Sequence, residues 1–286
     1  MIPTSFAYKR ASSVAEAISL LSAGEDAKLL AGGHSLLPSM KLRLNEAGTL
    51  IDIGQLNELR YIDASGGMQR IGAGSTHHEI ASSEVVGAHV PLLAQVGATI
   101  GDVQVRNKGT IGGSIAHADP AADWPAGLLA TDAVIVAQGP NGPREYKAAG
   151  FFQGLFTTAL GEHEIITEIR VPLPPQGTRV AYAKFAQPAS RFALVGCAVA
   201  IAQSGGNISH ARVAFTGVSG AAFRDQAVEQ ALMGQPANAD TFAAAAARAA
   251  SEQGHVMSDH FASEDYRRHL ARVFAKRALM AAAAEG

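Results

Sequence analysis

The sequence AGGHS at residues 31–35, together with TIGGS at residues 110–114, decides how this chain is interpreted. Each cluster follows an apolar stretch, and each contains two adjacent glycines. A glycine pair lets the backbone approach a ligand closely and turn its N–H groups outward, because no Cβ blocks the way. Loops of this kind form anion-binding nests. Two such nests facing each other predict a site for the two phosphates of a dinucleotide.

Hydroxyl side chains beside the glycines support this interpretation. Ser35, Thr110 and Ser114 each add a hydrogen-bond donor. A charge-assisted hydrogen bond of this kind contributes about 1.5–3 kcal/mol. A single Gly-Gly pair is usually an ordinary turn, so the argument depends on the two clusters together. The chain has no P-loop, and the run at residues 72–74 lacks the third glycine of a dinucleotide-binding fingerprint.

The composition sets the class of protein. The chain has 286 residues, which suggests about two domains, and its 48% of hydrophobic residues suffices for a substantial core. The net charge of −2 creates no field that favours nucleic acid or an anionic membrane. The chain also lacks basic runs interleaved with aromatic residues, so we expect no nucleic-acid partner.

The single cysteine limits the redox chemistry that this chain can contain. Cys197 alone allows neither an internal disulfide nor a cysteine-ligated zinc or iron–sulfur site within the chain. The first residues lack the pattern of a signal peptide, and no apolar run is long enough to span a bilayer. We therefore expect a cytoplasmic protein without a membrane span.

Periodicity and turn signals predict three successive parts. A capping box at residues 13–16 begins a helix that Gly24 ends. The proline-rich stretch 172–177 predicts a domain boundary, and the turn at 204–207 predicts a long hairpin. The other predicted strands are 28–31, 50–53, 68–73, 132–138, 164–171, 192–203 and 208–218. The other predicted helices are 76–82, 91–100, 123–129, 222–233, 240–252 and 264–284.

Several polar residues allow a functional and a structural interpretation. Asp119 and Asp123 follow the second cluster and suit sugar hydroxyls, although Asp123 is equally suited to cap a helix before Pro125. The segment His77-His78-Glu79 lacks the spacing of a metal-binding helix and reads as a solvated helix start. His117 beside Asp119 has no third metal ligand nearby.

Two further residues are ambiguous from the sequence alone. Lys184 lies in a predicted strand, where a lysine can reach a phosphate or flavin but is more often solvated. Phe192 opens the predicted hairpin, where core packing is the simpler interpretation.

The stretches 30–38 and 105–114 resemble the FAD-binding medium subunits of molybdenum hydroxylases, and the resemblance extends over essentially the whole chain. That family includes aerobic carbon monoxide dehydrogenase, dehydrogenases of N-heteroaromatics, and the xanthine dehydrogenase flavin domain. The resemblance implies an α+β fold: a two-subdomain FAD-binding domain of the vanillyl-alcohol-oxidase (PCMH) type, then a C-terminal domain with a three-stranded antiparallel sheet and a helical layer. The implied divisions are residues 1–55 and 56–175 for the two FAD-binding subdomains, and residues 176–286 for the C-terminal domain.

The resemblance also assigns the cofactor and its binding residues. The cofactor is FAD, with its pyrophosphate between the two clusters, its sugar-alcohol chain at Asp123 with Asp119 close by, and its ring near Ile165 or Ile166. Lys184 matches the family's strand lysine, and Phe192 matches the residue that shields one ring face. Ser114 departs from the family, which usually has asparagine or aspartate there. The expected binding residues are Ala31, Gly32, Gly33, His34, Ser35, Thr110, Gly112, Gly113, Ser114, Asp119, Asp123, Ile166, Lys184 and Phe192.

By resemblance, the chain is the electron-transfer subunit of a heterotrimeric molybdenum hydroxylase. A large subunit would hydroxylate carbon monoxide or an N-heteroaromatic at a molybdenum cofactor. A small subunit with two [2Fe-2S] clusters would pass electrons to FAD in this chain, and FAD would pass them to an external acceptor. The assembly would be a dimer of heterotrimers, and no residue here would act as a catalytic base. The alternatives are a free-standing flavin oxidase or reductase, and an assembly subunit that has lost its flavin.

Overall fold

The structure of the protein is a computed structural model that describes residues 1–284. A small parallel sheet forms the N-terminal part of the chain. Its strands lie in the order β1 (Ala7–Arg10), β3 (Thr49–Asp52), β2 (Ala27–Leu30), and both pairings are parallel. Helix α1 (Val14–Ala23) connects β1 to β2, and helix α2 (Leu36–Lys41) follows β2. The buried side chains of Val14 and Ile18 pack with Ile51 of the central strand in one apolar cluster. This packing fixes the end of β2, where the first glycine cluster lies.

The cap of helix α1 differs from the predicted capping box by one residue. The Ser13 side chain accepts a hydrogen bond from the Glu16 N–H, as the sequence predicted. The Glu16 carboxylate, however, accepts from the N–H of Ser12 at 2.7 Å rather than from that of Ser13. The helix therefore has its N-cap, but the reciprocal bond reaches one residue further back than in a capping box.

An antiparallel sheet forms the middle of the chain. Its five strands lie in the order β4 (Ile62–Ser65), β5 (Met68–Gly72), β10 (Ile165–Pro172), β6 (Val134–Gly139), β7 (Gly142–Lys147). The helices between β5 and β6 are α3 (His77–Ala81), α4 (Glu84–His89), α5 (Pro91–Ala98), α6 (Val103–Arg106), α7 (Ile111–His117) and α8 (Trp124–Ala130). The short elements are the 3₁₀ turn η1 (Asn57–Leu59) and the hairpin of β8 (Phe152–Gly154) and β9 (Thr157–Thr158).

The last part of the chain is an antiparallel sheet covered by helices. Its strands are β11 (Arg179–Ala186), β12 (Ala193–Ser204), β13 (Asn207–Thr216) and the two-residue β14 (Phe223–Arg224). The covering helices are α9 (Gln226–Leu232), α10 (Ala239–Ala246) and α11 (Glu264–Ala284). Gly205 and Gly206 both have positive φ at the tip of the β12–β13 hairpin, as a primed two-residue turn requires. The three long strands and the helical layer give the α+β architecture implied by the resemblance.

Strand β12 is buried on both of its faces. Successive side chains of a strand point to opposite sides of the sheet. Val195 and Val199 lie in the core beneath the C-terminal helices, whereas Ala198 and Ala200 lie in the core of the middle part of the chain. The sequence of β12 is therefore apolar almost throughout instead of alternating, and the strand separates two cores.

Two helices of the C-terminal layer are shorter than the sequence predicted. The predicted helix 222–233 begins only at Gln226, because Phe223 and Arg224 pair with β13 and Asp225 caps the helix by accepting from Val228 N–H. The predicted helix 240–252 ends at Ala246. Alanine periodicity indicates a helix, but it does not indicate where tertiary pairing and side-chain caps limit it.

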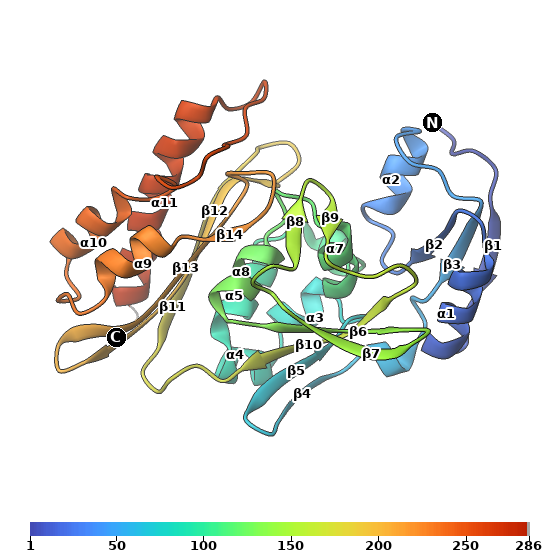
Figure 1. Cartoon of the computed structure of the whole chain (residues 1–286), viewed down its shortest axis with the longest axis horizontal. Coiled ribbons are helices and arrows are strands. Elements are labelled where there is room, and N and C mark those ends of the chain that lie inside the picture. Colours follow the sequence, from blue (N-terminus) through green and yellow to red (C-terminus); the bar gives the residue numbers. More distant parts are fainter. Residues whose placement is uncertain (285–286) are drawn as a thin grey trace.

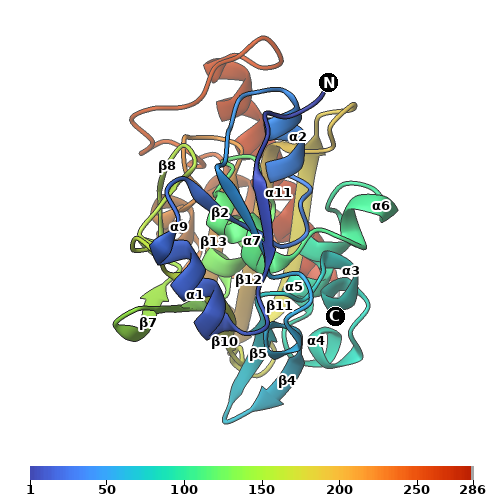
Figure 2. The same ribbon diagram turned by 90° about the vertical axis from the view of Figure 1, so that its right-hand side faces the viewer.

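The three sheets follow one another across the molecule (Figure 1). The small N-terminal sheet and α1 lie at one end, the five-stranded sheet in the middle, and the C-terminal sheet with its helices at the other end. In the view of Figure 2, the N-terminal strands lie in front of the rest of the chain. Because each larger sheet lies within one predicted segment, we propose the divisions 1–55, 56–175 and 176–286 for the folded protein. Among residues 1–284, no helix has the length and apolar character needed to cross a membrane.

Arg267 should contribute strongly to the stability of the contact between helix α11 and the C-terminal sheet. Its side chain is 3% exposed and donates to the carbonyl groups of Leu194 and Gly217 at 2.7 and 2.6 Å, and to Asp259 at 2.6 Å. Arg267→Met would leave these buried carbonyls without their donor, so we expect the free energy of unfolding to fall by roughly 3 kcal/mol. Urea denaturation monitored by circular dichroism measures this change.

The exposed Arg272 of the same helix provides the control for that variant. Arg272→Met should change the free energy of unfolding by less than about 0.5 kcal/mol. Equal losses in the two variants would contradict the role given to Arg267.

Candidate functional site

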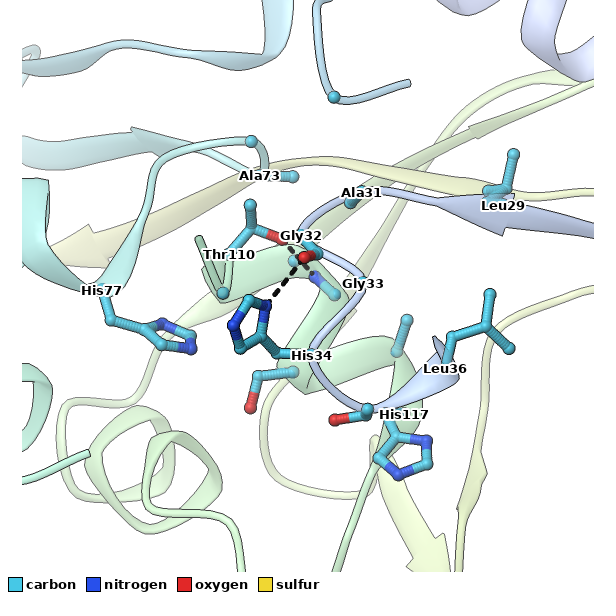
Figure 3. A pocket seen from close by; sticks show the side chains of 18 of the residues that line it. Leu29, Ala31, Gly32, Gly33, His34, Leu36, Ala73, His77, Thr110 and His117 are labelled. Carbon is cyan, nitrogen blue, oxygen red and sulfur yellow. Dashed lines mark hydrogen bonds between the residues drawn. The ribbon is translucent and has the colours of Figure 1, made fainter. Parts of the chain in front are cut away.

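A cavity of about 480 Å³ lies where the two glycine clusters meet. This volume lies within the range of about 300–1,000 Å³ that is common for small-molecule sites. Every predicted binding residue except Lys184 lines the cavity, and so do both glycine clusters. Residues far apart in the sequence, from the loop after β2 to the β11–β12 connection, therefore contribute to one site. Figure 3 shows the first cluster close to Ala73, His77, Thr110 and His117.

The first cluster provides the unoccupied backbone donors of this cavity. It follows β2, and Gly33 has a φ of +72°, which favours glycine. Among residues 1–284, no backbone acceptor receives a hydrogen bond from the N–H groups of residues 32–35. Ser35 precedes α2 without a side-chain cap bond. The loop at residues 32–35 is therefore the part of the site suited to an anion.

The second cluster is a helix start rather than a loop, which corrects the prediction that both clusters turn free N–H groups outward. Thr110 is the N-cap of α7, and its Oγ1 accepts from the Gly113 N–H at 3.2 Å. The N–H groups of Ile111 and Gly112 donate to Ser75 and Ala73 carbonyls. The hydroxyls of Thr110 and of Ser114, which also lines the cavity, retain the capacity to donate to a ligand.

The glycines of the two clusters have two different tasks. A Cβ on Gly32 would lie 2.2 Å from the Lys108 carbonyl oxygen, and a Cβ on Gly112 would lie 2.6 Å from the Ala73 Cβ. These two glycines therefore allow close packing of backbone segments. A Cβ on Gly113 would lie 2.9 Å from Thr110 Oγ1, on the side of α7 that faces Ala31. Gly113 thus keeps the space between the clusters open.

Asp123 is held by two residues of strand β11. Its carboxylate accepts from the Tyr182 hydroxyl at 2.5 Å and from Lys184 Nζ at 2.9 Å. Burial raises the pKa of Asp123 above its ordinary value, and the Lys184 ammonium and the Tyr182 hydroxyl oppose that shift. Asp123 occupies the N-cap position of α8, as the capping interpretation predicted, but its side chain makes no capping hydrogen bond. A carboxylate has about four lone-pair sites, so Asp123 can still accept from a ligand.

Lys184 lies behind the cavity and not in its wall. Its side chain is 6% exposed and also donates to the Thr99 carbonyl at 3.1 Å, so the interpretation as a solvated strand lysine is wrong. Gly196 on β12 makes room for the neighbouring Tyr182, because a Cβ there would lie 2.3 Å from the Tyr182 hydroxyl oxygen. The glycine in an otherwise apolar strand was the signal in the sequence for this arrangement.

The remaining predicted residues lie along the cavity wall. Asp119 accepts from the Ala121 N–H at 2.8 Å and lines the cavity next to Asp123. Ile165 and Ile166 are buried beside it. Phe192 is 42% exposed and borders the cavity, so the core-packing interpretation of this residue is wrong.

His77 is the main residue that sequence reasoning missed. It is 5% exposed, not solvated, and its Nδ1 lies 3.0 Å from the Nε1 of the buried Trp124. Burial lowers the pKa of His77 to about 4. A Cβ on Gly109 would lie 2.5 Å from His77 Nε2, so the glycine before Thr110 was the available sequence signal.

Other unpredicted residues complete the wall. His117, Ser190 and Arg191 line the cavity, and Arg191 has a φ of +61°. Within residues 1–284, no three His, Cys, Asp or Glu side chains are grouped so that they could hold a metal ion.

The buried His77 should make the protein less stable in mild acid. Its pKa is about 4 in the folded chain, against an ordinary value of 6.5. As pH falls through this window, the unfolded chain binds a proton that the folded chain excludes, so the free energy of unfolding decreases. The full loss is about 3 kcal/mol. Urea denaturation at steps between about pH 7.5 and about pH 4.5 measures the slope.

His77→Asn is the test variant for this slope, and His255→Asn at an exposed position is its control. The first variant should show a shallower decrease of stability with acid, and the second should follow the wild type. An unchanged slope in His77→Asn would contradict the assignment.

Comparison with known families covers nearly the whole chain. Residues 4–174 match the family described as FAD binding domain in molybdopterin dehydrogenase. Residues 180–282 match the family described as CO dehydrogenase flavoprotein C-terminal domain. The two matches meet near the proline-rich stretch that connects β10 to β11.

Full-length relatives agree with these matches. The carbon monoxide dehydrogenase medium chain of Hydrogenophaga pseudoflava is 45% identical over 99% of this chain and 98% of its own length. The glyceraldehyde dehydrogenase medium chain of Sulfolobus acidocaldarius is 40% identical over 97% of this chain and 98% of its own length. The solved Hydrogenophaga pseudoflava carbon monoxide dehydrogenase lacking the Mo-pyranopterin moiety matches with a TM-score of 0.95 at 46% identity, over 99% of both chains. The protein is therefore a member of the FAD-binding medium subunits of carbon monoxide dehydrogenase and related molybdenum hydroxylases.

Proposed function

We propose that this chain holds FAD as the electron-transfer subunit of a heterotrimeric molybdenum hydroxylase. The observation that carries the proposal is the cavity between the two glycine clusters, which combines free backbone donors at residues 32–35 with the acceptors Asp119 and Asp123 on the opposite segment. The single cysteine, Cys197, is buried beneath the C-terminal helices, so iron–sulfur clusters must belong to a partner subunit.

The chemistry of the cavity wall fits each part of FAD. Anionic phosphate suits the N–H groups at residues 32–35 together with the hydroxyls of Thr110 and Ser114. The acceptor oxygens of Asp119 and Asp123 suit the hydroxyls of a sugar-alcohol chain. Apolar side chains suit a flavin ring, and Ile166 and Phe192 provide them within the same cavity. We therefore propose all the residues predicted from the sequence as FAD-binding residues, with Lys184 acting through Asp123.

Lys184 and Tyr182 orient Asp123 for this task. Both donate to the carboxylate, one as an ammonium and one as a hydroxyl, and both lie on β11 of the C-terminal sheet. Burial raises the pKa of Asp123, and the Lys184 ammonium opposes that rise by favouring the ionised carboxylate, which can only accept hydrogen bonds. A ligand hydroxyl placed beside it must donate, which fixes the direction of that hydrogen bond.

When bound, FAD would supply the redox chemistry for electron transfer between the iron–sulfur clusters of a small subunit and an external acceptor. The residues of this chain bind the cofactor and exclude water from it. We propose no catalytic base here, because hydroxylation would occur at molybdenum in a large subunit. The proposed assembly is a dimer of heterotrimers located in the cytoplasm.

The substrate is not determined by this chain. Relatives that cover almost its full length are named for carbon monoxide in one case and for glyceraldehyde in another. Because one medium-chain architecture accompanies different substrates, selectivity must reside in another subunit. We retain carbon monoxide or an N-heteroaromatic compound as the proposed substrate classes.

Co-expression with the neighbouring genes tests the proposed function. We expect a stable complex whose visible spectrum shows both flavin and iron–sulfur absorbance, with this chain as the flavin carrier. Turnover of an organic substrate by the isolated yellow chain would instead support a free-standing flavin enzyme. A colourless but stable complex would support an assembly subunit without flavin.

Substituting either cavity glycine should abolish FAD retention without unfolding the C-terminal domain. Gly33→Val places a side chain at a φ of +72°, and Gly113→Val fills the space between the clusters. We expect each purified variant to lose the flavin absorbance that the wild type retains. Gly254→Val is the matched control, because a Cβ at that position meets open space. Stoichiometric flavin in both cavity variants would refute the proposed site.

A further inference from the structure

Backbone hydrogen bonds fix the position of His77 beside the second glycine cluster. Its N–H donates to the Gly109 carbonyl at 3.0 Å, and the Ile111 N–H donates to the Ser75 carbonyl at 3.0 Å. An isolated antiparallel bridge joins Thr76 to Thr110 between these two bonds. The first residue of α3 therefore cannot move independently of the residues that line the cavity.

Trp124 determines which nitrogen of His77 carries the proton. The indole Nε1–H is only a donor, and it lies 3.0 Å from His77 Nδ1. Nδ1 must therefore accept, and the neutral ring carries its proton on Nε2. Burial keeps the pKa of His77 at about 4, so the neutral form predominates at neutral pH. Because Trp124 is fully buried, water does not compete for this bond.

The protonated Nε2 lies at the cavity. His77 lines the cavity although its side chain is 95% buried, and its ring points toward the side on which His34 lies in Figure 3. A Cβ on Gly109 would lie 2.5 Å from Nε2, so the ring occupies the space that this glycine leaves. His34 is itself turned back to the Gly32 carbonyl, 2.9 Å from its Nδ1.

We propose that His77 binds FAD by donating its Nε2–H to an oxygen acceptor of the cofactor, and that Trp124 is the positioning residue that fixes the donating tautomer. This inference rests on the proposed FAD function and adds a binding residue to it. Among residues 1–284, Nε2 is not one of the fully enclosed side-chain atoms that lack a partner, which agrees with a ring that reaches the cavity. An Nε2–H at the cavity can donate to the oxygens of a phosphate or of the flavin ring. A neutral imidazole provides this hydrogen bond without adding a charge to the site.

His77→Asn separates this role from a purely structural one. The asparagine amide oxygen lies near the position of Nδ1 and can still accept from Trp124, but no atom replaces Nε2. At neutral pH, we expect the free energy of unfolding and the fluorescence of the only tryptophan to stay close to their wild-type values. The Kd for FAD of the full chain, measured by titrating the apoprotein, should rise about tenfold, which corresponds to about 1.4 kcal/mol.

The probes ADP and FMN identify the acceptor. A loss of affinity for ADP in His77→Asn would place the acceptor on the adenosine diphosphate half, and a loss for FMN would place it on the flavin half. His255→Asn is the exposed control and should bind all three ligands as the wild type does. Equal FAD affinity in wild type and His77→Asn would overturn the inference, whereas a wild type that binds no FAD would refute the proposed function instead.

Nitrogen-15 NMR of histidine-labelled wild type tests the tautomer without any substitution at His77. We expect a protonated Nε2 and an unprotonated Nδ1 for His77, with the Nε2–H exchanging more slowly after FAD is added. Trp124→Phe, which removes the indole donor, should give a mixture of the two tautomers. A wild-type ring protonated on Nδ1 would overturn the inference. An Nε2–H whose chemical shift and exchange rate do not change when FAD is added would also overturn it.

Discussion

The contact between the loop after β2 and the segment before α7 is the constraint on which the site depends. This contact brings Gly32 so close to the Lys108 carbonyl that no room is left for a Cβ. Within the middle part of the chain, Gly112 packs against Ala73 with equally little room. At Gly32 and Lys108, the part of the chain with the small parallel sheet meets the part with the five-stranded sheet through backbone atoms instead of side chains. The cavity exists because the two sheets approach this closely on one side of the contact while Gly33 and Gly113 keep the other side open.

The two halves of the site are chemically unequal. The N-terminal loop offers free N–H groups, whereas the N–H groups that start α7 already donate to protein acceptors. The acceptors for a ligand come from Asp119 and Asp123, and the latter depends on Tyr182 and Lys184 of the C-terminal sheet. An anion would therefore bind mainly to the first part of the chain, and a polyhydroxylated group mainly to the second, with the third part holding the acceptor in place.

Much of this could be predicted from the sequence, because local signals and the resemblance acted at the same positions. The hairpin at 204–207 and helix 264–284 follow from turn glycines and periodicity, whereas the fold class follows from the family resemblance. Tertiary contacts account for what was missed. His77 resembled a solvated helix start, since its burial depends on Trp124, which lies 47 residues further along the chain. Whether the Gly112 N–H is free depends likewise on Ala73, a partner that no local pattern specifies.

Strand β12 gives the C-terminal part a role in the whole molecule. Its Val195 and Val199 side belongs to one core and its Ala198 and Ala200 side to another, so neither core is complete without the same backbone. Gene fusions and truncations that treat residues 1–175 as an autonomous module would leave the apolar faces of helices α5 and α8 in water, because β11, β12 and β13 pack against these helices. Insertions between the FAD-binding and C-terminal parts are consequently tolerable in the surface connection, but separation of the parts is not.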